Sequence, residues 1–239
     1  MIFIPSCAAY SDCWQPWLQF YRKHWKAGYY HRIVLATDFA VPERQQGFDH
    51  VLELEAMTGK HYPTPAWTTR LHDALKFTDS KQFILCCEDH WPLPPADWEA
   101  VEIARKIVAE GTADCVRLAP CPGAPESQIG PFGPVPDGTP YRISCGPTLW
   151  NTECLREFLA YLQHVLPLPT AHHYENFGSP ASSRFGLNVW AVCPGETGSY
   201  SAMPFLNSAV TGGKWSQNAL VLAKELGIQV DTSNREIAT

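Results

Sequence analysis

The chain has 239 residues, which fits one domain or one domain with an elaborated end. Hydrophobic residues make up 45% and charged residues only 18%, a balance that excludes a disordered or fibrous protein. The net charge of -6 argues against a protein whose whole surface binds nucleic acid. The basic cluster at residues 22–32 is either a solvated helix end or a local binding patch.

The nine cysteines are scattered along the chain and form no CxxC pair. This usage predicts free thiols in a reducing, cytoplasmic compartment and no zinc ribbon. Residues 1–12 lack the basic region and the long apolar run of a signal peptide. No stretch approaches the ~20 apolar residues of a membrane span, so we expect a protein without a transmembrane segment.

The first half alternates between short apolar runs and segments with apolar residues at helical spacing. In chain order it predicts a strand at residues 2–5, a helix at 13–26, strands at 32–36 and 50–54, a helix at 65–77, a strand at 81–87, a helix at 95–109 and a strand at 114–118. This alternation predicts an α/β fold with a mostly parallel central sheet and helices on both faces.

The second half is less regular and rich in proline and glycine. In chain order it predicts a long loop or flap at residues 119–139, a strand at 141–145, a helix at 151–162, an irregular segment at 166–185, a strand at 187–192, a helix at 215–226 and a short strand at 228–230. Gly227 is the expected C-cap of the last helix.

Parallel sheets of this kind bind ligands at the carboxyl ends of their strands. Residues 6–8, Asp38 and residues 88–90 all follow predicted strands directly, so we expect them at one edge of the sheet. Neither a GxGxxG nor a GxxxxGK[ST] motif occurs, which weakens a dinucleotide-binding or P-loop interpretation.

The turn Glu88-Asp89-His90 ends the continuous apolar run at residues 81–87. Two adjacent carboxylates at the end of a buried strand are costly unless a cation or hydrogen-bond donors compensate their charge. Hard divalent cations such as Mn²⁺ or Mg²⁺ prefer carboxylate and phosphate oxygens. The turn is therefore either a metal site or, on its own residues alone, a capping or turn acid.

The order of six short motifs along nearly the whole chain resembles the small bacterial and phage glycosyltransferases of the GT-A fold, within the nucleotide-diphospho-sugar transferases. The motifs lie at residues 6–14 (SCAAYSDCW), 67–75 (WTTRLHDAL), 88–91 (EDHW), 149–151 (LWN), 174–179 (YENFGS) and 213–215 (GKW). The resemblance implies one GT-A-like domain over residues 1–239. Its nucleotide-binding half is residues 1–118 and its acceptor-side half is residues 119–239.

The resemblance also implies roles on the donor side. Nucleoside-binding positions would be Ser6, Cys7, Ala8 and Asp38, with Asp38 reading the base or ribose. Arg70 would approach the nucleotide from its helix, or else is a surface arginine, and Lys214 would pair with the diphosphate. The implied donor is a nucleotide sugar, most simply a UDP sugar.

At the reaction centre, the resemblance implies that Asp89 is the main metal ligand, with Glu88 and His90 in support. Glu175 would be the general base that deprotonates the acceptor hydroxyl. His173, or its neighbour His172, would complete the metal shell or replace Glu175 as the base. The metal would be Mn²⁺ or Mg²⁺. The chain departs from the family pattern because Glu88-Asp89-His90 replaces two aspartates and an aromatic residue, which leaves the metal's identity open.

Three functional hypotheses remain from the sequence. The first is a metal-dependent glycosyltransferase whose acceptor is a saccharide or a hydroxymethylated base in phage DNA. The second is a nucleotidyltransferase, which is disfavoured because the loop after the first strand has no glycine-rich basic signature. The third is a sugar- or protein-binding module of the same fold without catalysis.

Overall fold

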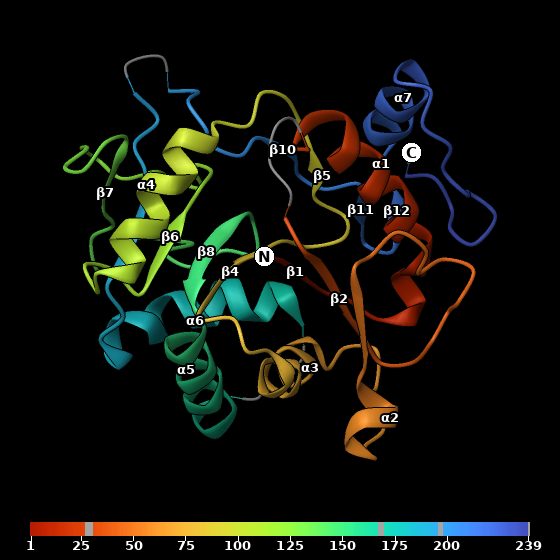
Figure 1. Cartoon of the computed structure of the whole chain (residues 1–239), viewed down its shortest axis with the longest axis horizontal. Coiled ribbons are helices and arrows are strands. Elements are labelled where there is room, and N and C mark those ends of the chain that lie inside the picture. The colour runs from red at the N-terminus through yellow and green to blue at the C-terminus, as the bar shows by residue number, and fades with distance from the viewer. Residues whose placement is uncertain (27–30, 167–169, 196–197, 239) are drawn as a thin grey trace.

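The computed structural model describes residues 1–26, 31–166, 170–195 and 198–238 (Figure 1). Within this part, an eight-stranded central sheet has the strand order β3-β2-β1-β4-β8-β6-β9-β7. Its strands are β1 (Ile2–Pro5), β2 (Ile33–Thr37), β3 (His50–Glu53), β4 (Gln82–Leu85), β6 (Cys115–Arg117), β7 (Phe132–Pro134), β8 (Thr148–Asn151) and β9 (Val189–Val192).

The sheet is mostly parallel, as the alternating first half predicts. Strands β1, β2, β3 and β4 pair in parallel, and β6 pairs in parallel with β9. Strand β8 lies antiparallel between β4 and β6, and β7 is antiparallel to β9 at the edge. The predicted fold class is therefore confirmed, and the carboxyl ends of β1, β2 and β4 meet at one edge of the sheet.

Helices cover both faces of the sheet (Figure 1). The longer ones are α1 (Trp14–His24), α3 (Trp67–Ala74), α4 (Trp98–Ala109), α5 (Thr152–Val165), α6 (Ala171–Phe185) and α7 (Gln217–Glu225). Shorter helical segments are η1 (Ala8–Cys13), α2 (Leu54–Thr58) and η2 (Leu75–Phe77). Two small antiparallel pairs lie outside the central sheet: β5 (Trp91–Pro92) with β10 (Phe205–Leu206), and β11 (Val210–Thr211) with β12 (Lys214–Trp215). No helix in the described ranges is both long and apolar enough for a membrane crossing.

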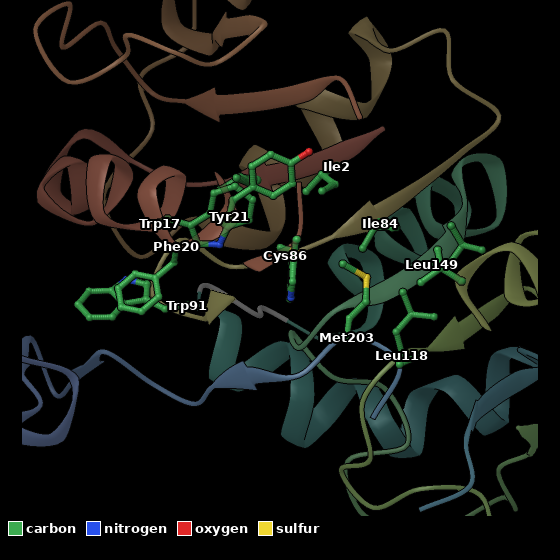
Figure 2. Close-up of a cluster of buried hydrophobic side chains, with 14 of the residues drawn as sticks. Ile2, Trp17, Phe20, Tyr21, Ile84, Cys86, Trp91, Leu118, Leu149 and Met203 are labelled. Carbon is green, nitrogen blue, oxygen red and sulfur yellow. The ribbon is translucent and has the colours of Figure 1, made fainter. Parts of the chain in front are cut away.

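Two hydrophobic cores flank the sheet because successive residues of a strand point to opposite faces. On one face, Ile84 and Cys86 pack with the aromatic side of α1 (Figure 2). Residues of α4 and α7 belong to the same core. On the other face, Leu85 and Cys87 pack with residues of α3, α5 and α6. The apolar character of the whole run before Glu88 thus follows from burial on both sides.

Four predictions in the less regular parts of the chain are wrong. Residues 141–145 are not a strand, and the strand next to β4 is β8 instead. Residues 171–185, expected to be irregular, form helix α6. The loop at 119–139 contains the edge strand β7, and residues 228–230 form no strand.

Tertiary contacts explain the two largest of these errors. Backbone groups of the 141–145 segment bond to side chains rather than to a neighbouring strand: Ile143 N donates to Ser179 Oγ at 3.3 Å, and Cys145 N donates to Glu175 at 2.7 Å. Gly178 and Pro180 weaken the helical signal of α6. Yet a Cβ at Gly178 would lie 2.7 Å from Ile143 Cδ1, so the glycine permits the close packing that holds the helix in place.

Candidate functional site

The ends of β1 and β4 are joined by a hydrogen-bonded chain of buried side chains. Ser6 Oγ donates to Glu88 Oε1 at 2.9 Å and accepts from Trp14 Nε1 at 2.8 Å. Ser6 is 1% exposed and Glu88 is 7% exposed. The predicted proximity of residues 6–8 and 88–90 is therefore present in the structure.

Asp38, at the end of β2, holds the loop that follows β1. Its Oδ1 accepts from Ala8 N at 2.7 Å and from Phe39 N at 3.0 Å. Cys7, between Ser6 and Ala8, is buried, and burial is the main cause that raises the pKa of its thiol to about 11. The four predicted nucleoside-binding positions therefore lie together at the ends of β1 and β2, and among them Cys7 lines one of the hollows described below.

Glu88 and Asp89 form a pair of neighbouring carboxylates with different surroundings. Burial, followed by the adjacent charge of Asp89, raises the pKa of Glu88 to about 8, although Ser6 and Arg70 oppose the shift. Asp89 accepts a hydrogen bond from Ser208 Oγ, and its backbone carbonyl accepts from Ala209 N at 2.8 Å. Because burial and the charge of Asp89 disfavour the charged form of Glu88, a cation bound there would favour its ionised form.

Ligand atoms of Cys87, Glu88 and Asp89 all lie within 4.8 Å of one another. Two carboxylates suit a hard divalent cation, and the sulfur of Cys87 adds a softer donor. The residues therefore fit a divalent metal. His90 lies beside this group: its Nε2 is 4.0 Å from Asp89 Oδ1 and its ring packs on Phe205 with a centroid distance of 4.7 Å. Its Nδ1 is buried and has no hydrogen-bond partner among the described residues.

Three hollows adjoin the carboxylate pair and share lining residues. The first, here called the Arg70 hollow, has a volume of about 370 Å³, and its lining includes Cys7, Tyr10, Trp67, Arg70, Glu88 and His172. The Asp89 hollow has about 490 Å³, and its lining includes Cys87, Asp89, Cys145, His172, Glu175 and Ser208. The Tyr141 hollow has about 230 Å³, and its lining includes His90, Tyr141, Ser144, Glu175, Phe205 and Asn207. Glu88 faces the first hollow and Asp89 the second, so the pair stands between them.

Arg70 is buried at 3% exposure on α3 rather than lying on the surface. Its Nη1 and Nη2 donate to the carbonyls of Pro63 and Thr64 at 3.0 and 2.9 Å, while its Nε has no partner among the described residues. Its charge opposes the rise in the pKa of Glu88. Arg70 is thus a fixed positive group on the wall of the hollow that carries its name.

Glu175 belongs to the first turns of α6 and lines both the Asp89 and the Tyr141 hollows. Its Oε1 accepts from Cys145 N at 2.7 Å, which fixes the orientation of the carboxylate. His172 lines all three hollows. His173 is placed differently: its Nδ1 is 2.5 Å from Thr170 Oγ1, its ring stacks on Phe177, and it does not line any of the three hollows in the described structure.

Lys214 lies outside the three hollows as the structure describes them. Its side chain is 51% exposed and its Nζ pairs with Glu236 Oε2 at 2.7 Å. A different cation, Arg235, lies close to the donor-side wall, where it bonds Asp12 at 2.6 and 3.0 Å and lies 4.2 Å above the ring of Tyr10. Sequence reasoning missed Arg235 because its partners lie more than 220 positions away, and no local pattern marks such a pair.

Tyr141 was also missed, since it was assigned to a strand. Its φ of 52° lies in the left-handed region, where a bulky residue is a true outlier and the strain costs on the order of 1 kcal/mol. Its carbonyl accepts from Arg117 Nη1 at 2.7 Å, and Arg117 also bonds the carbonyls of Cys121 and Pro122. The buried Arg117 therefore ties together the two loops beside the Tyr141 hollow.

No protein-family model matches the chain, and no curated protein does. Solved structures that are similar to it include a 2-C-methyl-D-erythritol 4-phosphate cytidylyltransferase from Thermus thermophilus, at 14% identity and a TM-score of 0.49, with 95% of this chain and 98% of that chain covered. The glycosyltransferase GlyE of Streptococcus pneumoniae has 11% identity and a TM-score of 0.49, with 81% and 45% covered. S. aureus TarS 1-349 in complex with UDP-GlcNAc has 12% identity and a TM-score of 0.48, with 88% and 58% covered.

The chain thus spans nearly all of the cytidylyltransferase but only about half of each of these two glycosyltransferase chains. The mostly parallel central sheet with helices on both faces is the α/β fold class expected from the sequence. Both transferase classes considered from the sequence are present among these neighbours, which therefore do not choose between glycosyl and nucleotidyl transfer.

Proposed function

We propose that this protein is a metal-dependent glycosyltransferase that moves a sugar from a nucleotide diphosphate donor, UDP in the simplest case, to an acceptor hydroxyl. The observation that carries the proposal is the position of the Glu88-Asp89 pair. Glu88 lines the Arg70 hollow and Asp89 lines the adjoining Asp89 hollow. A donor that spans both hollows would bring its diphosphate to the two carboxylates.

Asp89, Glu88 and the neighbouring Cys87 would hold a divalent ion, Mn²⁺ or Mg²⁺, which neutralises the charge that develops on the departing diphosphate. Asp89 is the principal ligand in this proposal because it faces the roomier of the two hollows and bonds to a single hydroxyl, that of Ser208. His90 lies within reach to bind or orient a ligand of the ion.

The nucleoside would occupy the Arg70 hollow. Cys7 lines this hollow and Asp38 holds the adjacent Ala8 by its backbone N–H, while Tyr10 and Trp67 offer aromatic faces. Arg70 supplies a positive charge close to Glu88, on the side from which a diphosphate would enter. Lys214 has no part in this proposal because it pairs with Glu236 at the surface.

Glu175 is the proposed general base. It faces the Asp89 hollow, where the transferred sugar would lie, and the Tyr141 hollow beyond it. A carboxylate held by Cys145 N at one oxygen keeps the second oxygen available for the proton of an acceptor hydroxyl. His172 is the neighbouring histidine in the same hollows, whereas His173 is engaged with Thr170.

A titration of a UDP sugar with and without Mn²⁺ tests the metal site. In Asp89→Asn we expect Mn²⁺-dependent donor binding to fall at least about tenfold, roughly 1.4 kcal/mol, with the thermal unfolding midpoint little changed. Asp79→Asn is the matched control, since Asp79 has an 89% exposed side chain and takes no part in the described hollows. Equal donor affinity in Asp89→Asn and the wild type would refute the assignment.

Product analysis separates this function from nucleotidyl transfer. A glycosyltransferase releases the nucleoside diphosphate from a nucleotide sugar, while a nucleotidyltransferase releases pyrophosphate from a nucleoside triphosphate. We expect release of UDP from a UDP sugar in the presence of Mn²⁺ and no pyrophosphate from UTP or CTP. The reverse result would assign the protein to the second class.

A further inference from the structure

The Tyr141 hollow adjoins the Asp89 hollow, and the two share His90, His172, Glu175 and Asn207. Its volume of about 230 Å³ is below the ~300–1,000 Å³ of sites for drug-sized ligands. The hollow therefore suits a single ring rather than an extended chain. Its contents would lie next to the proposed base.

The lining of the Tyr141 hollow combines aromatic faces with neutral hydrogen-bonding groups. Tyr141 and Phe205 supply rings, and Ser144 and Asn207 supply hydroxyl and amide groups. Among the described lining residues none is a lysine or arginine, while Glu175 adds a carboxylate. His90 and His172 also line the hollow, but no lysine or arginine of the described lining stands opposite Glu175. A phosphate or sulfate would therefore meet a like charge there, and the lining favours an uncharged ligand rich in hydroxyl groups.

The backbone at Tyr141 points to a role for its ring. Glycine adopts a φ of 52° without strain, so the fold itself has no need of a tyrosine at this position. Arg117, which is 1% exposed, holds the Tyr141 carbonyl at 2.7 Å and maintains the conformation. The side chain remains 37% exposed at the hollow, where a ring can cover the apolar face of a sugar.

We propose that the Tyr141 hollow is the acceptor subsite and that it takes a neutral pyranoside, stacked on Tyr141 with one hydroxyl directed to Glu175. This inference rests on the proposed glycosyl transfer and deepens it, because it names the class of acceptor. It selects a saccharide over a base in DNA, whose flanking phosphates would approach the carboxylate of Glu175.

Direct binding, measured by saturation-transfer NMR with UDP and Mn²⁺ present, tests the subsite without requiring turnover. The probes are neutral methyl pyranosides of glucose, galactose, mannose and N-acetylglucosamine, compared with glucose 6-phosphate and a short duplex that contains 5-hydroxymethylcytosine. The variants are Tyr141→Gly, which relieves the backbone strain, and Tyr141→Phe, which keeps the ring. Phe77→Ala removes a 40% exposed ring outside the described hollows and is the control.

We expect the wild type to bind at least one neutral pyranoside. The affinity for this pyranoside should fall about tenfold in Tyr141→Gly and stay unchanged in Tyr141→Phe and Phe77→Ala. The thermal midpoint of Tyr141→Gly should stay at or above that of the wild type. Absence of pyranoside binding, preference for the phosphate or the duplex, or equal affinity in Tyr141→Gly would overturn the inference. If the wild type does not bind UDP in the presence of Mn²⁺, the proposed function is overturned instead. The two failures are therefore distinguishable.

Discussion

The cleft formed by the three hollows has a donor wall, at the ends of β1, β2 and β4, and an acceptor wall, at residues 141–145. The two walls are held in place in different ways. On the donor side, Ser6, Asp38 and Glu88 follow three adjacent parallel strands, so the main-chain ladder of the sheet brings them together. On the acceptor side, Tyr141 and the residues up to Cys145 lie in a loop without ladder bonds, held by the side chains of Arg117, Ser179 and Glu175. Many backbone hydrogen bonds between strands hold the donor side in place, whereas a few side chains hold the acceptor side.

This difference predicts where single substitutions act. A change on the donor wall should alter ligand binding and leave the wall's shape, because the backbone bonds remain. A change of a clamp residue on the acceptor wall, that is Arg117, Ser179 or Glu175, should alter both, because each of them bonds a backbone group of the loop. The most informative substitutions therefore keep the hydrogen bond to the loop backbone and remove only the side chain's role in the reaction.

Glu175→Gln is such a substitution and should have the largest effect. Glutamine can still accept from Cys145 N, so the loop should keep its place, but it cannot take a proton. We expect kcat for sugar transfer to fall by about a hundredfold or more, with donor affinity and the thermal midpoint nearly unchanged. Steady-state kinetics with a UDP sugar measure this.

The control for that experiment is Glu157→Gln, an exposed acid on α5. An unchanged kcat in Glu175→Gln would remove Glu175 from the reaction. A comparable loss of donor affinity and of kcat would mean that the residue shapes the donor site, and the contrast between the two walls would then be incorrect.

Arg235, like Asp38 at Ala8 N, supports the donor side through side-chain bonds in addition to the ladder of the sheet. It pairs with Asp12, with side-chain exposures of 8% and 2%, and covers the ring of Tyr10. Arg235→Gln leaves a buried carboxylate without its partner, so we expect a loss of about 3 kcal/mol in the free energy of unfolding and weaker donor binding. Urea unfolding and donor titration measure the two effects.

Arg44→Gln provides a matched comparison, since Arg44 pairs with Asp231 in the same region with side-chain exposures of 25% and 45%. We expect this more exposed pair to contribute less than about 1 kcal/mol. The double variant Asp12→Asn/Arg235→Gln should recover part of the stability lost in Arg235→Gln. If Arg235→Gln and Arg44→Gln lose the same free energy of unfolding, the Asp12–Arg235 pair does not stabilise the donor wall more than the exposed pair does.

The same contrast explains what the sequence could predict. The donor wall was predictable because apolar runs that end in Ser6, Asp38 and Glu88 mark strand ends, and parallel strands bring their ends together. Helix α6 was not predictable from the sequence, because Gly178 and Pro180 lower its helical signal. The helix is stabilised instead by contacts with Ile143, which lies elsewhere in the chain. Local propensity is a weak guide where long-range packing decides.

The site residues also divide into those that a local sequence pattern marks and those that only long-range contacts bring to the site. Glu175 was expected at the acceptor, on resemblance alone, and the structure brings it to the hollows next to Asp89. Tyr141, Ser208 and Arg235 carry no local signal, because each acts through residues far away in the chain. Lys214 belongs to the motif at 213–215 and His173 immediately precedes the one at 174–179, yet the structure pairs them with Glu236 and Thr170.

Asp73 tests the donor-side helix α3 and should give the smallest effect. Burial of this carboxylate raises its pKa, but hydrogen bonds from Lys60, Lys76 and Tyr62, at 2.6 to 2.8 Å, outweigh burial and hold the pKa of Asp73 well below its usual range. A carboxyl group whose pKa is lowered by folding stabilises the fold above its unfolded pKa of about 4, and this contribution is lost as the pH falls below that value. Asp73→Asn should therefore lower the free energy of unfolding at neutral pH by about 1–2 kcal/mol.

The pH dependence separates this charge effect from a packing defect. The difference between the wild type and Asp73→Asn should shrink as the pH is lowered from about 5 toward 2, because protonated Asp73 no longer gains from Lys60 and Lys76. Asp79→Asn, with a carboxylate 89% exposed, should show no such dependence. Since α3 also carries Arg70, donor affinity at neutral pH reports whether loosening the helix reaches the cleft. We expect only a small change, because Arg70 is held independently by the carbonyls of Pro63 and Thr64. A large loss of donor affinity would mean that the donor wall depends on side-chain clamps as much as the acceptor wall does.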